Sequence, residues 1–122
     1  LKCFAGCGAV KVLAKDECML LLERAVPGTS LKICFPNQEH ESIEIACAIM
    51  KKLHQANIPT THNLPHIKDW LKALDKDWNI PNHYLQKARK LRDQLLKTAK
   101  PDVLLHGDLH HDNILQNGND EA

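Results

Sequence analysis

The apolar pattern of the first 30 residues predicts a pair of strands followed by a break. Residues 9–13 read as a strand, and the polar residues 14–17 form a connection of hairpin length. Residues 18–22 are a continuous apolar run that is too short for a typical helix, so they predict a strand buried on both faces. Residues 27–30 contain Pro and Gly and are expected to interrupt regular structure.

The middle of the chain has helical periodicity and predicts three helices. The first covers residues 38–56, in which Ile45, Ile49 and Leu53 recur every four positions. The second begins near Pro65, and its expected buried stripe is Ile67, Trp70, Leu71 and Leu74. The third opens at Pro81, and one of its sides carries Leu85, Ala88, Leu91, Leu95 and Ala99. We expect the first and third helices to form a small bundle through these apolar positions.

The last part of the chain predicts a polar loop held between two short strands. Residues 103–105 are apolar and read as the first strand, and residues 114–115 read as the second. The loop at 106–113 is rich in His and Asp. Residues 116–122 are expected to form a turn and a loose tail.

Composition excludes some classes of partner. The chain of 122 residues has a formal net charge of +1, which gives no basis for a nucleic-acid-binding surface. No apolar run approaches the ~20 residues of a membrane-spanning helix, so we expect no nucleic acid, no membrane and a cytoplasmic location. Five cysteines without paired CxxC spacing are interpreted as free thiols in a reducing compartment. The chain begins with Leu1 instead of Met, and we expect it to be an internal piece of a longer protein.

The residues with the clearest chemical meaning lie in the loop at 106–113. Asp108 and Asn113 are five positions apart there, which suits phosphoryl transfer. A carboxylate can accept the proton of an attacking hydroxyl, and an amide oxygen is a ligand that Mg²⁺ accepts. His106 is expected to hold the shape of the loop by packing and hydrogen bonding, and Gly107 to allow close backbone approach.

This loop resembles the catalytic loop of a known kinase family. Residues 106–115 contain the pattern H-G-D-x-x-x-x-N, whereas protein kinases carry Arg after the His. The run is similar to that of the aminoglycoside/hydroxyurea antibiotic resistance kinases, which include streptomycin kinases. Residues 8–13, 20–25 and 27–31 resemble, in the same order, the last hairpin of the nucleotide lobe and the linker between the lobes.

The resemblance implies an α+β, protein-kinase-like fold of which the chain holds a part. Residues 1–25 would be the end of the nucleotide-binding N-lobe, comprising its last hairpin and the interlobe hinge. Residues 26–122 would be the helical first half of the C-lobe up to the catalytic loop. The implied reaction transfers the γ-phosphoryl group of ATP to an alcohol group of an aminoglycoside such as streptomycin, or to hydroxyurea, which inactivates the antibiotic.

The resemblance also implies roles for single residues. Asp108 would be the catalytic base and Asn113 a ligand of Mg²⁺, with ATP as co-substrate. The backbone of Glu23, Arg24 and Ala25 would bind the adenine. A glycine-rich phosphate cover, a strand lysine paired with a helix glutamate, and an Asp as second magnesium ligand are also needed but are not recognised in the sequence, and Asp120 is not assigned that role. We therefore expect the chain by itself to lack activity.

Several alternatives stay open at this point. His106, Asp108, His110 and His111 could form a metal cluster, or the loop could be a solvated surface turn. His110, His111 and Asp112 are interpreted as loop residues near the substrate. Another small-molecule kinase, for homoserine, choline or ketosamines, would share the fold, and a truncated remnant without catalysis is the non-enzymatic alternative. Trp70 and Trp78 could stack on a substrate, although Trp70 is expected in the core.

Overall fold

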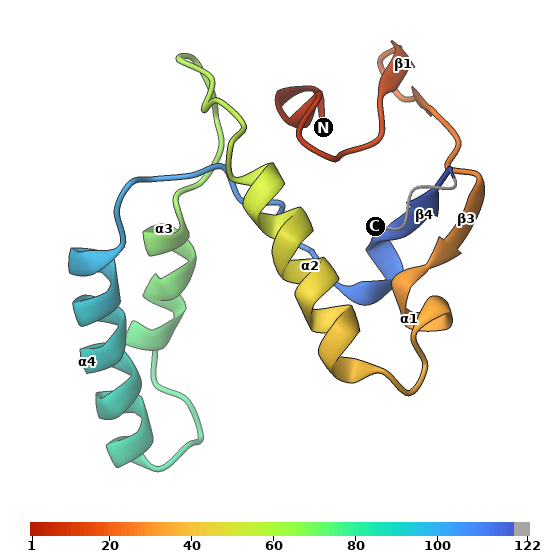
Figure 1. The fold of residues 1–122 in the computed structure, drawn as a ribbon. Coiled ribbons are helices and arrows are strands. Elements are labelled where there is room, and N and C mark those ends of the chain that lie inside the picture. Colours follow the sequence, from red (N-terminus) through yellow and green to blue (C-terminus); the bar gives the residue numbers. More distant parts are fainter. Residues whose placement is uncertain (119–122) are drawn as a thin grey trace. The chain divides into compact units, whose positions relative to one another are not determined.

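The computed structural model describes residues 1–118 and divides the chain into two compact units (Figure 1). Unit 1 contains Leu1–Pro59 together with the residues from Val103 onward, and unit 2 is Thr60–Asp102. Both ends of the sequence therefore contribute to unit 1, and the catalytic-loop pattern lies in the same unit as the first hairpin.

Unit 1 begins with a short 3₁₀ helix, η1 (Lys2–Phe4), and a hairpin. Strand β1 (Val12–Lys15) pairs antiparallel with β2 (Leu20–Leu22). The hairpin is predicted correctly, but β1 starts later and β2 is shorter than the sequence suggests. The expectation that residues 18–22 are buried on both faces is wrong, since Met19 is 71% exposed and Leu21 59% exposed. Within residues 1–118 the hairpin is a two-stranded sheet, so no further strand pairs with its edges.

A second antiparallel sheet joins distant parts of the sequence. Strand β3 (Pro27–Ser30) pairs with β4 (Leu115–Asn117). The expected interruption at 27–30 is therefore wrong, because pairing with β4 holds this Pro- and Gly-containing segment extended. The ladder places the segment that follows the hairpin beside the segment that follows the polar loop (Figure 1).

Helices α1 (Leu31–Cys34) and α2 (Glu39–Leu53) complete unit 1. The helix predicted at 38–56 is thus present with slightly shorter bounds. Its C-terminal end forms the core of the unit, where Leu53 and Ala56 pack with Phe4. The half-buried residues around this core are Cys7, Ala9, Ile49, Leu104 and Leu109. Leu109 belongs to the polar loop, so the core anchors that loop directly.

Unit 2 consists of α3 (Ile67–Leu71), the 3₁₀ helix η2 (Lys72–Asp75) and α4 (Asn82–Thr98). Leu85 is its one buried hydrophobic residue among those described. Polar contacts join α4 to the other two helices. Arg89 Nε donates to Leu74 O at 2.8 Å, and Arg92 Nη1 lies 2.6 Å from Asp75 Oδ1.

The predicted helices of unit 2 are present, but their predicted apolar stripes are only partly buried, since Leu71, Leu74, Leu85 and Ala88 are shielded and other members are exposed. Trp70 is 61% exposed and is not a core residue. Leu91 and Leu95 are also exposed, so the expected bundle core does not include them. The side of α4 that faces η2 instead carries Leu85 with the half-buried residues Ala88, Arg89, Arg92 and Leu96. Arginine side chains that donate to carbonyl groups thus share this side of α4 with the apolar residues.

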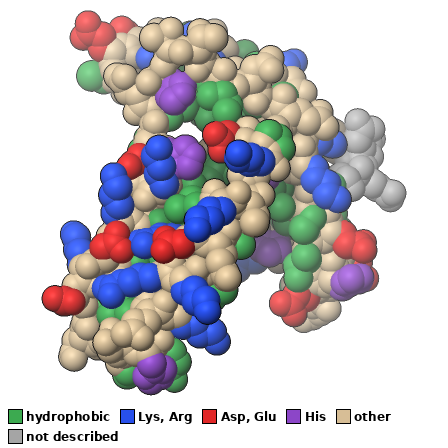
Figure 2. Space-filling view, turned by 90° about the vertical axis from the view of Figure 1, so that its left-hand side faces the viewer, with side chains coloured by type: hydrophobic (Ala, Val, Ile, Leu, Met, Phe, Trp, Pro, Cys, Tyr) green, Lys and Arg blue, Asp and Glu red, His purple; other side chains and the backbone are tan. Residues whose placement is uncertain are grey.

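The described residues form an α+β arrangement of helices with two small antiparallel sheets. The protein-kinase-like fold and the lobe boundary after Ala25 stay predictions. No helix in residues 1–118 combines the length and apolar character needed to cross a bilayer. Figure 2 looks onto the side of α3 and α4 and shows Lys and Arg side chains interspersed with Asp and Glu.

Candidate functional site

The polar loop at 106–113 leads into β4 through a 3₁₀ turn, η3 (His111–Asn113). The strand predicted at 103–105 is absent from the described residues, because this segment is extended but pairs with no neighbouring strand. Packing of Leu104 and Leu109 on the unit 1 core holds the loop from its N-terminal side. Pairing of β4 with β3 holds it from the other side.

Asp108 and Asn113 lie next to each other across the loop. Asn113 Nδ2 donates to Asp108 O at 2.9 Å and lies 3.3 Å from Asp108 Oδ2. The backbone N–H of Asn113 donates to His110 O at 2.9 Å. These contacts close the loop on itself, so the two residues that the sequence singles out share one small site. The side chain of Asp108 is 78% exposed, which leaves it open to a substrate.

His110 lies between two carboxylates of the loop. Its Nε2 atom is 3.7 Å from Asp108 Oδ2, and its Nδ1 atom is 3.7 Å from Asp112 Oδ2. Nδ1 also accepts the backbone N–H of Asp112 at 3.3 Å. The sequence predicts only that His110 is a loop residue near the substrate. It does not predict the proximity of His110 to Asp108, because that contact depends on how the loop closes.

His106 and Gly107 shape the start of the loop. The ring of His106 lies 6.3 Å from that of Phe4, centroid to centroid, and its Nδ1 accepts the N–H of Asp108 at 3.4 Å. Gly107 has a φ of +85°, a conformation that side-chain-bearing residues rarely adopt. A Cβ added there would meet nothing within 4 Å. A glycine is therefore required here by the positive φ. No described residue approaches it closely, so the expected close approach of backbone is not observed within the described residues.

Contacts with α1 attach the end of the loop to the segment after the hairpin. Lys32 Nζ lies 3.5 Å from Asp112 Oδ2, and the N–H of Leu31 donates to Ile114 O at 2.8 Å. Both partners of the ion pair are largely exposed, so it contributes little to stability. The ion pair instead links the position of the loop to that of α1, because a shift of the loop would change this contact.

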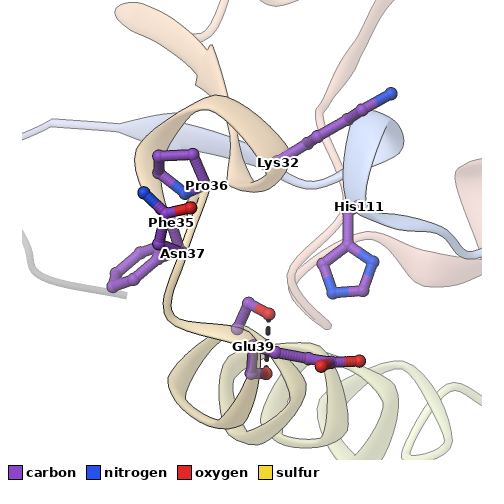
Figure 3. A pocket seen from close by; sticks show the side chains of 7 residues that line it. Lys32, Phe35, Pro36, Asn37, Glu39 and His111 are labelled. Atoms are coloured by element: carbon purple, nitrogen blue, oxygen red, sulfur yellow. Dashed lines mark hydrogen bonds between the residues drawn. The ribbon is translucent and has the colours of Figure 1, made fainter.

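A pocket of about 360 Å³ opens beside the loop, between α1 and the first turn of α2 (Figure 3). Its lining residues are Lys32, Phe35, Pro36, Asn37, Glu39, Ser42 and His111. Figure 3 shows the imidazole of His111 directed toward the first turn of α2. Its Nε2 atom is shielded from solvent and has no hydrogen-bond partner among the described residues. The sequence pattern did not predict this pocket, because its lining combines residues 32–42 with His111, which is far away in the sequence.

Glu23, Arg24 and Ala25 form the connection between β2 and β3. The N–H of Glu23 donates to Lys11 O at 2.9 Å, and Ala25 is buried. Within residues 1–118, the N–H groups of Arg24 and Ala25 donate no backbone hydrogen bond. The segment is joined to the end of the loop region through Val26, whose N–H donates to Asn117 Oδ1 at 3.1 Å.

The positions of the His, Asp and Asn side chains in the loop limit which metal ion it could hold. Among residues 1–118, no group of three or more His, Cys, Asp or Glu side chains is placed to hold a metal ion. The alternative of a cluster of His106, Asp108, His110 and His111 is therefore not supported. Asn113 uses its amide nitrogen toward Asp108, while its Oδ1 accepts no hydrogen bond within the described residues. A free amide oxygen beside a carboxylate fits a hard, oxygen-seeking cation such as Mg²⁺.

Comparison with known proteins agrees with the resemblance of the loop. The family model described as "Aminoglycoside/hydroxyurea antibiotic resistance kinase" matches residues 1–121. A streptomycin 3''-kinase from Klebsiella pneumoniae is 32% identical over 114 residues, which are 93% of this chain and 42% of that protein. The chain thus spans less than half the length of this relative. No solved structure gives a significant match. The chain belongs to the aminoglycoside/hydroxyurea antibiotic resistance kinase family.

Proposed function

We propose that the protein carrying this chain is an ATP-dependent phosphotransferase that acts on an alcohol group of an aminoglycoside such as streptomycin, or on hydroxyurea. Membership of the family and the similarity to a streptomycin 3''-kinase support this reaction. The observation that carries the proposal is the contact of Asp108 with Asn113 in an exposed loop. Phosphoryl transfer depends mainly on positioned groups and charge stabilisation, which a small polar loop on a fixed core can supply.

Asp108 is the proposed general base of the reaction. Its exposed carboxylate can accept a hydrogen bond from the acceptor hydroxyl and take its proton as the phosphoryl group arrives. The backbone around it is fixed by Gly107, by the ring of His106 and by Leu109 in the core. The backbone that carries the carboxylate is therefore held in place, while the carboxylate itself is largely exposed to solvent.

Asn113 is the proposed ligand of Mg²⁺ through Oδ1. Bound Mg²⁺ would neutralise the negative charge of the nucleotide phosphates. The amide nitrogen of Asn113 faces Asp108, so the side chain has one end for the base and one end for the cation. The hydrogen bonds of the amide nitrogen to Asp108 fix the side chain of Asn113, and this also fixes the direction of its Oδ1.

The segment of Glu23, Arg24 and Ala25 is the proposed adenine site. The N–H groups of Arg24 and Ala25, which donate no backbone hydrogen bond within residues 1–118, are donors of the kind that a purine ring nitrogen accepts. The β3–β4 ladder and the Val26 contact with Asn117 attach this segment to the loop region. Side chains of Glu23 and Arg24 are not needed for such recognition, because backbone groups make it.

The Asp108→Asn variant tests the proposed reaction. It keeps the size of the side chain but removes the proton acceptor, so phosphorylation should fall by roughly 10²–10⁴-fold, the range that general-base catalysis supplies. The measurement is the transfer of radioactive phosphate from ATP to streptomycin or hydroxyurea by the protein as its host cell makes it. Asp112→Asn is the matched control, since it removes a carboxylate from the same loop. Full activity of Asp108→Asn, or no transfer to any alcohol acceptor by the unaltered protein, would contradict the proposal.

A further inference from the structure

The imidazole of His110 is held in one orientation by its neighbours in the loop. Nδ1 accepts the backbone N–H of Asp112 at 3.3 Å. A ring nitrogen that accepts a hydrogen bond carries no proton, so the neutral imidazole must carry its proton on Nε2. Nε2 is the atom that lies 3.7 Å from Asp108 Oδ2. The loop backbone thus selects the tautomer that presents an N–H group to the catalytic carboxylate.

Two nitrogen atoms of the loop lie near the same oxygen of Asp108. Asn113 Nδ2 lies 3.3 Å from Oδ2, and His110 Nε2 approaches that oxygen at 3.7 Å. Within residues 1–118 no hydrogen bond reaches Asp108 Oδ1. Donors on one oxygen of a carboxylate fix its plane and leave the other oxygen as the better proton acceptor.

We propose that His110 is a positioning residue that orients Asp108 through Oδ2, so that Oδ1 is the oxygen that takes the proton from the acceptor hydroxyl. The inference rests on the proposed function of Asp108. The present separation of 3.7 Å is longer than a hydrogen bond, and catalytic hydrogen bonds often tighten only when the substrate is bound. Because His110 is half-exposed, its contact with the carboxylate should contribute little to stability, and its proposed effect is to restrain rotation of the carboxylate.

A series of His110 variants separates positioning from packing. Alanine removes the donor, so kcat for acceptor phosphorylation should fall about tenfold while KM for ATP stays within about twofold, since a misplaced reacting group costs rate more than binding. His110→Gln keeps an N–H donor at similar reach and should recover most of the lost kcat. His40→Ala is the matched control, because that exposed histidine of α2 lies outside the loop.

The tautomer gives a readout that does not depend on activity. Long-range ¹H–¹⁵N correlation spectra of the ring, recorded in mildly alkaline solution where an ordinary imidazole is neutral, should show the His110 proton on Nε2. The Asp108→Ala variant should shift the signal of that nitrogen and leave the His40 ring unchanged. A proton on Nδ1, or no change in the His110 ring on loss of Asp108, would overturn the inference.

The outcomes distinguish this inference from the proposed function. If Asp108→Asn is inactive while His110→Ala keeps full kcat, the positioning role is wrong and the reaction assignment stands. If His110→Gln is as slow as His110→Ala, the donor is not what matters, and the positioning role is again wrong. If the unaltered protein phosphorylates no acceptor, the proposed function fails, and the ring spectra alone decide whether His110 is bound to Asp108.

Discussion

Unit 1 combines helices with two small sheets, whereas the described elements of unit 2 are helices, and the two units are stabilised by different interactions. Unit 1 has a small apolar core of Phe4, Leu53 and Ala56, a local hairpin of β1 and β2, and a β3–β4 strand pair that links distant segments. Unit 2 buries Leu85 and otherwise connects α4 to η2 through arginines that bind carbonyl groups. The polar loop lies in unit 1 and packs on its core. The difference teaches that the chemically important loop is supported by apolar packing and strand pairing, whereas unit 2 is stabilised by polar contacts close to solvent.

The largest expected effect comes from a core substitution in unit 1. Leu53→Ala should lower the free energy of unfolding by about 2–5 kcal/mol, the cost of a cavity at a fully packed leucine. Leu53 is 3% exposed and lies in the same cluster as Leu104 and Leu109, so the loop should lose its support as well. Urea unfolding followed by circular dichroism measures the change. Met50→Ala on the same helix is the control, since Met50 is exposed and should cost much less. Equal losses for both variants would mean that unit 1 has no distinct core.

A smaller effect is expected from an arginine of unit 2. Arg89 donates to Leu74 O at 2.8 Å and to Lys76 O at 3.3 Å. Arg89→Met keeps much of the aliphatic stem but leaves these carbonyls without their donor, which should cost about 1–3 kcal/mol. Hydrogen exchange of the amides in η2 and α4 is the measurement, and the amides of α2 serve as an internal reference. Lys87→Met is the matched control on the exposed side of α4. Unchanged exchange in η2 would show that the arginine contacts do not stabilise unit 2.

The smallest effect concerns the Asp69–Lys72 pair of unit 2. A hydrogen bond from the Lys72 ammonium, 2.8 Å away, lowers the pKa of Asp69, and the same contact raises the pKa of Lys72. A lowered carboxyl pKa stabilises the folded state above the ordinary pKa of Asp, and this contribution disappears as pH falls through the lowered value. The raised pKa of Lys72 gives a contribution that disappears only as pH rises through its own value.

The pH dependence of unit 2 provides the test of this pair. Asp69→Asn should reduce the loss of stability on acidification, as measured by thermal unfolding at a series of acidic pH values. Because both side chains are exposed, high salt should reduce the effect further. Asp77→Asn is the control, since no ion pair of Asp77 occurs among the described residues. An identical acid profile for Asp69→Asn and the unaltered chain would show that the pair is not coupled to folding.

Much of the local structure was predictable from the sequence. The hairpin, the helix that became α2 and the helix that became α4 follow from apolar spacing and from Pro at their boundaries. The apolar stripe of α2 correctly predicted a core residue, since Leu53 lies in the core. The stripes of α3 and α4 were only partly correct, since Leu85 is buried but Trp70, Leu91 and Leu95 stay exposed. Periodicity shows which residues share a face of a helix but does not show which face has a partner.

The sequence by itself determined the loop pattern around Asp108 and Asn113, and with it the family, because these residues and their spacing are local properties of the chain. The tertiary structure decided three other features. It paired residues 27–30 with β4, it brought nitrogen atoms of Asn113 and His110 close to one oxygen of Asp108, and it placed half-buried arginines of α4 against carbonyl groups of η2. Each of these depends on contacts between segments far apart in sequence or on how a loop closes. Such contacts are selected by packing and hydrogen-bond satisfaction across the whole fold, which no local pattern encodes.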